Sequence, residues 1–188
     1  MAIYSNDISI VSLISIAFVH SITYNYPIIK NLYNGGENMA YGLNAVTIRT
    51  NNTEEGMKKI DEIWQDVISG KLPILYDSNH SFRQGVSPVS RYDHYDNDEN
   101  GDYDFSILGV TSDFFQEMEK AVSSGTYKKY EESDDNLGLS AKKAWEKVWN
   151  EHKTGVIKRA FTRDYESTVP AAYTKDGKAH CYLYIAIG

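Results

Sequence analysis

A short acidic segment near the middle of the chain has the spacing of calcium ligands. Oxygen donors recur at alternate positions in Asp96, Asp98 and Asn100, and Gly101 stands where such loops bend sharply. The position that should carry a bidentate glutamate is Ile107, and the flanking segments have strand patterns rather than helix patterns. We therefore interpret the segment as a hairpin turn, and we expect calcium to leave the melting temperature unchanged.

The sequence contains few residues in patterns typical of covalent or metal-based catalysis. The sequence contains no motif of a serine or cysteine nucleophile, and its histidines lack the spacing of metal ligands. These histidines are His20, His80, His94, His152 and His180. The single cysteine, Cys181, excludes an intrachain disulfide and has strand-like neighbours, which predicts a buried structural thiol. The sequence thus predicts no catalytic residue, no metal site and no cofactor.

The aromatic side chains offer the chemistry of a site for flat cations. The chain has 15 tyrosines, 6 phenylalanines and 3 tryptophans. Ring faces attract cations, and a carboxylate beside them adds a charge contact when it is partly desolvated. Trp64, Trp145 and Trp149 fall at helical spacing, so core packing or the floor of a ligand site would explain each. Three tyrosines near turns could likewise pack in the core or contact a ligand: Tyr92, Tyr95 and Tyr127.

The hydrophobic pattern predicts six strands and two helices that would position these residues. Strand-like runs cover residues 41–50, 86–95, 103–110, 118–130, 159–166 and 179–187. The first helix should start at a capping box of Asn52 and Glu55 and end at Gly70, and the second should cover residues 140–152. A long connection is expected at 71–84 and an acidic loop at 131–136. Because strand, helix, strand, strand occurs twice, we expect an α+β fold of two units around a pseudo-two-fold axis, with a central cleft.

Composition limits the partners that the chain could bind. Its 188 residues, 41% of them hydrophobic, suit one domain with a real core. The formal net charge of -7 and the lack of a basic stripe argue against direct binding of nucleic acid. The apolar run at residues 8–19 is shorter than the about 20 residues of a membrane-spanning helix, and no basic residue precedes it. We therefore expect a cytoplasmic protein with no membrane partner.

The first 38 residues differ in composition from the rest, with Pro27 and the pair Gly35-Gly36 before Met39. Met39 opens the patterned region, so we expect residues 39–188 to form the domain. Residues 1–38 would be an extension of uncertain status, a weak anchor or an added strand.

An ordered set of segments between Met39 and Gly188 resembles the GyrI-like, or AraC-type, bacterial effector-binding family. The segments are Gly42-Leu43, residues 48–52, Ile63-Trp64, residues 92–95, 98–104 and 124–127, Ala144-Trp145, Val148-Trp149, and residues 159–166 and 184–187. This resemblance implies the duplicated fold with a cleft for small molecules, often cationic and aromatic drugs. Many members carry a preceding helix-turn-helix domain. Residues 1–38 are too short for one, so a stand-alone domain is expected.

The resemblance also implies which residues contact the ligand. The run Asp164-Tyr165-Glu166 matches the family's acidic motif at the end of the penultimate strand, so Glu166 is expected to face a bound cation. Asp93 and Asp104 are weaker candidates, with a turn or surface role as the alternative. The complete set of expected ligand-binding residues is Glu166, Tyr92, Tyr95, Tyr127, Trp64, Trp145, Trp149 and Phe161.

The expected function is therefore binding of a small cationic or aromatic molecule, in transcription regulation or drug sequestration, with a protein partner as a further option. Two alternatives remain open. Some relatives hydrolyse cyclopropanoid genotoxins, although hydrolysis would need two carboxylates that converge on one water. A protein-binding modulator of gyrase or of a regulator would instead use the acidic surface and an exposed sheet edge.

Overall fold

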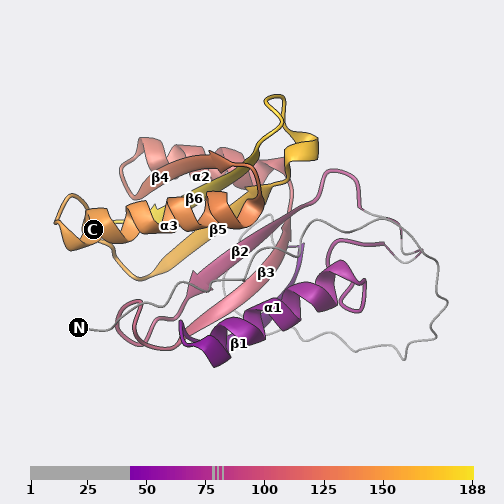
Figure 1. The fold of residues 1–188 in the computed structure, drawn as a ribbon, viewed down its shortest axis with the longest axis horizontal. Helices are drawn as coiled ribbons and strands as arrows, with labels where there is room; N and C mark the ends of the chain where they lie inside the picture. Colours follow the sequence, from indigo (N-terminus) through magenta and orange to yellow (C-terminus); the bar gives the residue numbers. More distant parts are fainter. Residues whose placement is uncertain (1–42, 78, 80, 82) are drawn as a thin grey trace.

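The computed structural model describes residues 43–77, 79, 81 and 83–188, which form one six-stranded antiparallel sheet flanked by helices (Figure 1). The strands are β1 (Leu43–Thr50), β2 (Ser87–Asp93), β3 (Tyr103–Val110), β4 (Tyr127–Asp134), β5 (Arg163–Val169) and β6 (Ala179–Ala186). Their order across the sheet is β1-β3-β2-β5-β6-β4. The predicted α+β class is confirmed, whereas the predictions for residues 1–38 lie outside the described residues.

Helices cover both faces of this sheet. Helices α1 (Glu54–Ile68) and α3 (Leu137–Lys153) pack on one face, over opposite halves of the sheet, and α2 (Ser112–Ser123) packs on the other (Figure 1). A short 3-10 turn, Ala171–Tyr173, precedes β6. The helices of the described part of the chain are too short or too polar to span a bilayer.

Three buried clusters hold these layers together. Under α1 the cluster includes Ile60, Ile63, Val67, Phe105 and Ile107. Under α3 it includes Ala144, Val148, Cys181, Leu183 and Ile185, so the predicted buried position of the thiol is confirmed. Under α2 it includes Val89, Phe114, Met118, Tyr165 and Tyr184. Burial of apolar area at roughly 25 cal/mol per Å² makes these clusters the main source of stability.

The central strand pair, β2 and β5, decides which side chains share a face. Ser90 lies opposite Glu166, and Tyr92 lies opposite Asp164. Successive side chains of a strand point to opposite faces, so these positions face α1 and α3. The intervening pairs, Arg91 with Tyr165 and Asp93 with Arg163, face the side of α2.

The hydrophobic pattern placed most elements correctly, but the strand expected at residues 159–166 is displaced to Arg163–Val169 and helix α2 was not expected. Both predicted helices and the strand at 103–110 are confirmed, and β2 and β6 lie within their predicted runs. The predicted strand at 118–130 is wrong, because its first half belongs to α2. Phe114, Met118 and Val122 recur at four-residue steps, which puts one stripe of a helix on the sheet. The helix ends before Gly125, whose φ of 80° suits a left-handed turn, and the expected acidic loop is largely strand β4.

The start of α1 also differs from the expectation. Thr53 caps the helix, and its side chain accepts from the backbone N–H of Gly56, so the predicted capping box of Asn52 and Glu55 is wrong. Asn52 instead donates to the carbonyl of Glu99 at 2.7 Å. Its Oδ1, the atom that would cap the helix, accepts instead from the hydroxyl of Tyr103 at 2.7 Å.

Gly56 is a position where a side chain would not fit, and its replacement by alanine is expected to destabilise the protein. A Cβ at this position would fall on the carbonyl oxygen of Asn51, and the carbonyl of Gly56 already accepts from the buried hydroxyl of Thr50 at 2.8 Å. We expect a loss of about 1–3 kcal/mol in the free energy of unfolding for Gly56→Ala, measured by urea denaturation.

The matched control for this change is Glu55→Ala, in the same helical turn, where the side chain is 83% exposed and pairs with Lys59. Surface changes of this kind stay within about 0.5 kcal/mol. Equal stability of the two variants would show that the close approach of Gly56 to Asn51 is not a constraint.

Candidate functional site

Glu166 lies at the centre of the sheet, on β5, where the halves covered by α1 and α3 meet. Its Oε2 accepts two hydrogen bonds of 2.8 Å, one from the hydroxyl of Tyr92 on β2 and one from Nε1 of Trp145 on α3. Among the described residues no hydrogen bond reaches Oε1. The residue is partly exposed, and Oε1 is the carboxylate oxygen that has no hydrogen-bond partner among the described residues.

The charge of Glu166 is not balanced by a neighbour. Within residues 43–188, as far as they are described, no lysine, arginine or histidine forms an ion pair with this carboxylate. Burial raises the pKa of Glu166, although the hydrogen bonds from Trp145 and Tyr92 act in the opposite direction. An unpaired carboxylate among protein atoms is costly to fold and is typical of functional positions.

Partly exposed aromatic rings surround Glu166. The ring of Trp145 meets Tyr92 edge to face at 5.3 Å between centroids, and it stacks on Trp149 at 6.0 Å. Trp149 is 43% exposed, which leaves one indole face open to solvent. Tyr92 also contacts the fully buried Phe105, so the core holds one side of the ring while the other side faces the site. Such rings can stack on a flat ligand without a change of backbone.

A second, fully buried charge centre lies beside this group. Arg159 and Asp164 form an ion pair of 2.6 Å in which neither side chain exceeds 1% exposure. Asp164 also accepts from the hydroxyl of Tyr95 at 2.9 Å and from the backbone of Ala186 at 2.8 Å. The guanidinium lies 4.3 Å from the ring centroid of Phe161, whose φ of 50° is rare for a bulky residue. Sequence reasoning missed Arg159, because nothing in its spacing marks it as buried.

The structure brings together most, but not all, of the residues expected to bind a ligand. Glu166, Tyr92, Trp145 and Trp149 form one contact group. Phe161 and Tyr95 contact each other at 5.6 Å, and Arg159 joins them to Trp145. The two remaining aromatic candidates are Trp64, which packs on the cluster under α1, and Tyr127, which lies near Tyr165 on the opposite face.

Tyr127 is thus separated from Glu166 by the sheet. Its prediction followed from its place after a glycine turn, which gives no information about the face of β4 on which the side chain lies. Asp93 and Asp104 also lie on the side of α2 and do not contact Glu166.

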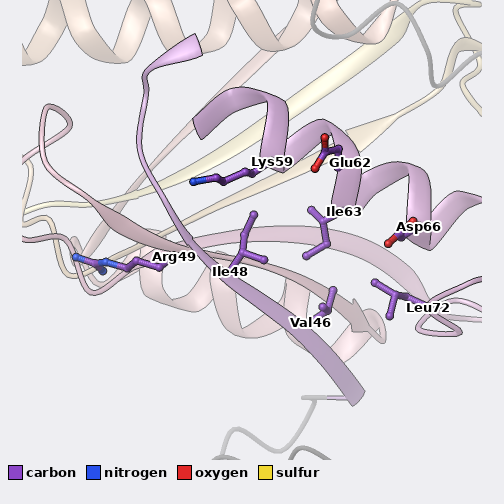
Figure 2. Close-up of a pocket in the computed structure, with 8 residues that line it drawn as sticks. All are labelled: Val46, Ile48, Arg49, Lys59, Glu62, Ile63, Asp66 and Leu72. Atoms are coloured by element: carbon purple, nitrogen blue, oxygen red, sulfur yellow. The ribbon is translucent and has the colours of Figure 1, made fainter. Parts of the chain in front are cut away.

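A separate groove of about 540 Å³ runs between β1 and α1 (Figure 2). Its lining residues are Val46, Ile48, Arg49, Lys59, Glu62, Ile63, Asp66 and Leu72. Figure 2 shows Lys59, Glu62 and Asp66 on the helix, so charges of both signs lie at the opening, whereas the guanidinium of Arg49 points away from the groove, toward Asp96 and Asp104. This groove contains none of the expected ligand-binding residues, and its mixed rim favours no single ligand charge.

The group around Glu166 is better suited to binding than to acid–base catalysis. Burial raises the pKa of the Tyr92 phenol well above its ordinary value, so Tyr92 stays a neutral donor. The second carboxylate, Asp164, is held by Arg159, Tyr95 and a backbone N–H. Only Glu166 has an oxygen available, whereas hydrolysis of a strained ring needs a base and an acid in reach of the same substrate.

Comparison with known proteins gives a likeness of fold. The sequence matches no protein-family model and no curated protein. The structure is similar to the crystal structure of an integron cassette protein from the mobile metagenome of Vibrio cholerae, with a TM-score of 0.51 and 18% sequence identity. The match covers 79% of this chain and 97% of that protein. At this identity the likeness shows that the two chains share a fold.

Proposed function

We propose that the protein binds a flat aromatic cation at Glu166, between α1 and α3, as an effector-binding protein of the GyrI-like kind. The observation that carries the proposal is the unpaired carboxylate of Glu166, partly exposed and surrounded by partly exposed rings. A ligand cation would supply the missing opposite charge, and the rings would supply stacking and cation–π attraction.

The strand order supports the duplicated form of this fold. In the first half β1, α1, β2 and β3 follow one another, and the strands lie in the order β1-β3-β2. In the second half β4, α3, β5 and β6 lie in the order β4-β6-β5. The halves meet where β2 pairs with β5, so a pseudo-two-fold axis would pass near Tyr92 and Glu166. A ligand would approach Glu166 along this axis.

The polar contacts around Glu166 favour a cation over an anion. The adjacent positive charge, Arg159, is already balanced by Asp164 at 2.6 Å and by Glu99 at 3.3 Å. Around Glu166 the described residues therefore offer an anion no free positive partner, and an anion would meet the carboxylate directly. A cation would meet Oε1 of Glu166 and the open face of Trp149. Binding of such a cation would serve transcription regulation or drug sequestration.

The pH dependence of affinity tests this proposal. We expect affinity for ethidium, measured by quenching of tryptophan fluorescence, to fall as pH decreases, because a proton competes with the cation for Glu166. Burial raises the pKa of Glu166, so the fall should begin above the usual glutamate value of about 4.3 and level off once Glu166 is protonated, at the affinity expected for an uncharged side chain.

The control ligand is a phenanthridinone, which is uncharged but similar in shape. Its affinity should stay constant over the same range while the protein remains folded. Parallel pH profiles for the two ligands would contradict a role for Glu166 as the charge partner. Net consumption of a cyclopropanoid substrate in the same assay would favour hydrolysis instead.

A further inference from the structure

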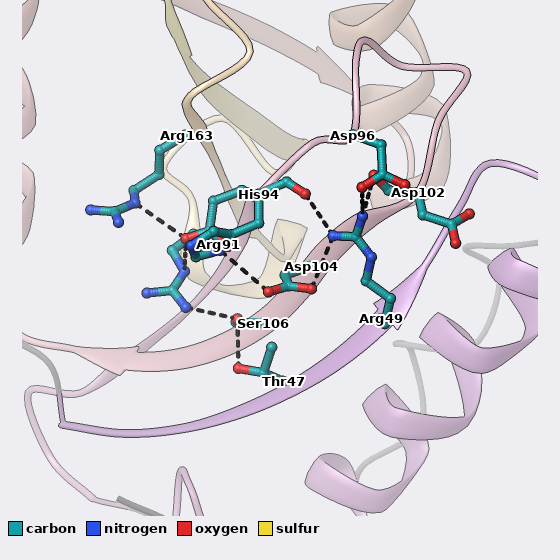
Figure 3. Close-up of polar contacts among 10 residues, drawn as sticks. Thr47, Arg49, Arg91, His94, Asp96, Asp102, Asp104, Ser106 and Arg163 are labelled. Atoms are coloured by element: carbon teal, nitrogen blue, oxygen red, sulfur yellow. Dashed lines mark hydrogen bonds and ion pairs between the residues drawn. The ribbon is translucent and has the colours of Figure 1, made fainter. Parts of the chain in front are cut away.

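A second polar group lies on the sheet face opposite Glu166, at the end of the β2–β3 hairpin (Figure 3). Asp93 on β2 lies directly opposite Asp104 on β3, and His94 follows Asp93 where the strand ends. The figure shows His94 and Asp104 facing each other between the guanidinium groups of Arg91 and Arg49. This group takes no part in the proposed binding of an aromatic cation.

We infer that Oδ1 of Asp93, Nδ1 of His94 and Oδ2 of Asp104 form a binding site for a divalent transition-metal ion such as Zn²⁺. The three donor atoms all lie within 4.8 Å of one another, and Nδ1 of His94 is 3.3 Å from each carboxylate oxygen. Zinc at about 2.0 Å from each donor in a tetrahedral arrangement separates neighbouring donors by roughly 3.3 Å. One nitrogen and two oxygens are ligands that such ions accept.

The carboxylate of Asp93 gives an independent indication of a missing partner. Its side chain is 2% exposed, and of the residues that the structure describes none makes a hydrogen bond to Oδ1. A buried carboxylate oxygen without a donor costs free energy unless a cation satisfies it. His94 cannot supply this partner to both carboxylates at once, because Nδ1 carries at most one proton.

The other oxygen of each carboxylate is already held by arginine. Oδ2 of Asp93 lies 3.1 Å from Nε of Arg91 and 3.3 Å from Nε of Arg163. Oδ1 of Asp104 accepts from Arg49 at 3.2 Å. These contacts fix each carboxylate so that its remaining oxygen faces His94, which is the role of outer residues around metal ligands in proteins.

The site is open on one side. The side chain of His94 is 71% exposed, whereas that of Asp104 is 29% exposed. An ion could therefore reach the donors from solvent, and a water or an exogenous ligand could complete the coordination. Three protein ligands with one open position is the arrangement of zinc sites that exchange their fourth ligand.

Titration of the metal-free full-length protein with Co²⁺ and Zn²⁺ tests the inference. We expect Co²⁺ to give visible d–d absorption and Zn²⁺ to raise the melting temperature, and calcium to do neither. His94→Gly removes one ligand, and glycine accepts the φ of 49° at this position without strain. The affinity for Zn²⁺ should fall about 100-fold or more in His94→Gly, with an unchanged far-ultraviolet circular dichroism spectrum.

Two further variants make the result specific. Asp104→Asn keeps an acceptor for Arg49 and should also lose Co²⁺ absorption. The control is His180→Gln, because His180 also contacts two carboxylates, Glu131 and Asp176, which are both exposed. This control should bind zinc like the unchanged protein. Absence of any Co²⁺ or Zn²⁺ binding by the unchanged protein, or full affinity in His94→Gly, would overturn the inference.

Discussion

Replacement of Glu166 by glutamine is expected to lower the affinity for ethidium by about tenfold or more. Glutamine keeps the size of the side chain and an oxygen that can accept from Tyr92 and Trp145, but it removes the charge. A partly desolvated contact to a charge contributes on the order of 1.5–3 kcal/mol, and about 1.4 kcal/mol corresponds to tenfold in affinity. The measurement is a fluorescence titration at neutral pH, with the uncharged phenanthridinone as the reference ligand.

The same variant should not be less stable than the unchanged protein. Burial raises the pKa of Glu166, so the ionised side chain costs stability in the folded state at neutral pH. This cost is absent below the unfolded pKa and grows as pH rises through the folded pKa. Glu166→Gln should therefore melt at the same or a higher temperature at neutral pH, and its advantage should disappear in acid.

A change of charge elsewhere on the molecule gives the control for Glu166→Gln. Glu146 lies on α3 with 56% of its side chain exposed, so Glu146→Gln makes the same chemical change without touching the aromatic group. It should leave affinity for ethidium unchanged. If Glu166→Gln binds ethidium as tightly as Glu146→Gln does, Glu166 is not the charge partner.

Replacement of Asp164 by asparagine is expected to cost about 3–5 kcal/mol of unfolding free energy. The change removes the charge that balances Arg159, whose side chain is 1% exposed, and leaves a buried guanidinium without its closest ion partner. The NH2 group of asparagine, a donor, could also face Arg159 or the hydroxyl of Tyr95, which are donors themselves. In a chain of this length the loss corresponds to a fall of roughly 10 °C in melting temperature.

The exposed pair of Lys142 and Glu146, with an N–O distance of 3.8 Å, provides the comparison. Such surface pairs contribute about 0–1 kcal/mol, so Glu146→Gln should melt close to the unchanged protein. Similar melting temperatures for Asp164→Asn and Glu146→Gln would mean that the pair of Arg159 and Asp164 does not stabilise the fold.

Much of the architecture could be predicted from periodicity, because α1, α3 and the strands of the central hairpin each carry a clear pattern. Helix α2 was missed because the strand expected at residues 118–130 begins inside the helix, and this boundary divides the stripe of Phe114, Met118 and Val122. The residue that caps α1 could not be predicted from the sequence, because Asn52 contacts a hairpin residue 47 positions away.

The candidate site was predictable only in part. The resemblance to a family pointed to Glu166, whereas no sequence pattern could show that Tyr92 and Trp145 bind one oxygen of it. The pair of Arg159 and Asp164 was not foreseen, because the chain turns back between them at Phe161 with a positive φ. Histidine spacing along the chain likewise gave no sign of the proposed metal site, since Asp104 reaches His94 through the register of the hairpin.

A crystal structure of the complex with ethidium would show whether an aromatic cation binds beside Glu166. We expect density for the ligand between α1 and α3, stacked on Trp145 or Trp149, with its positive charge facing Oε1 of Glu166. Ethidium bound only in the groove between β1 and α1, or on the face that carries α2, would contradict it.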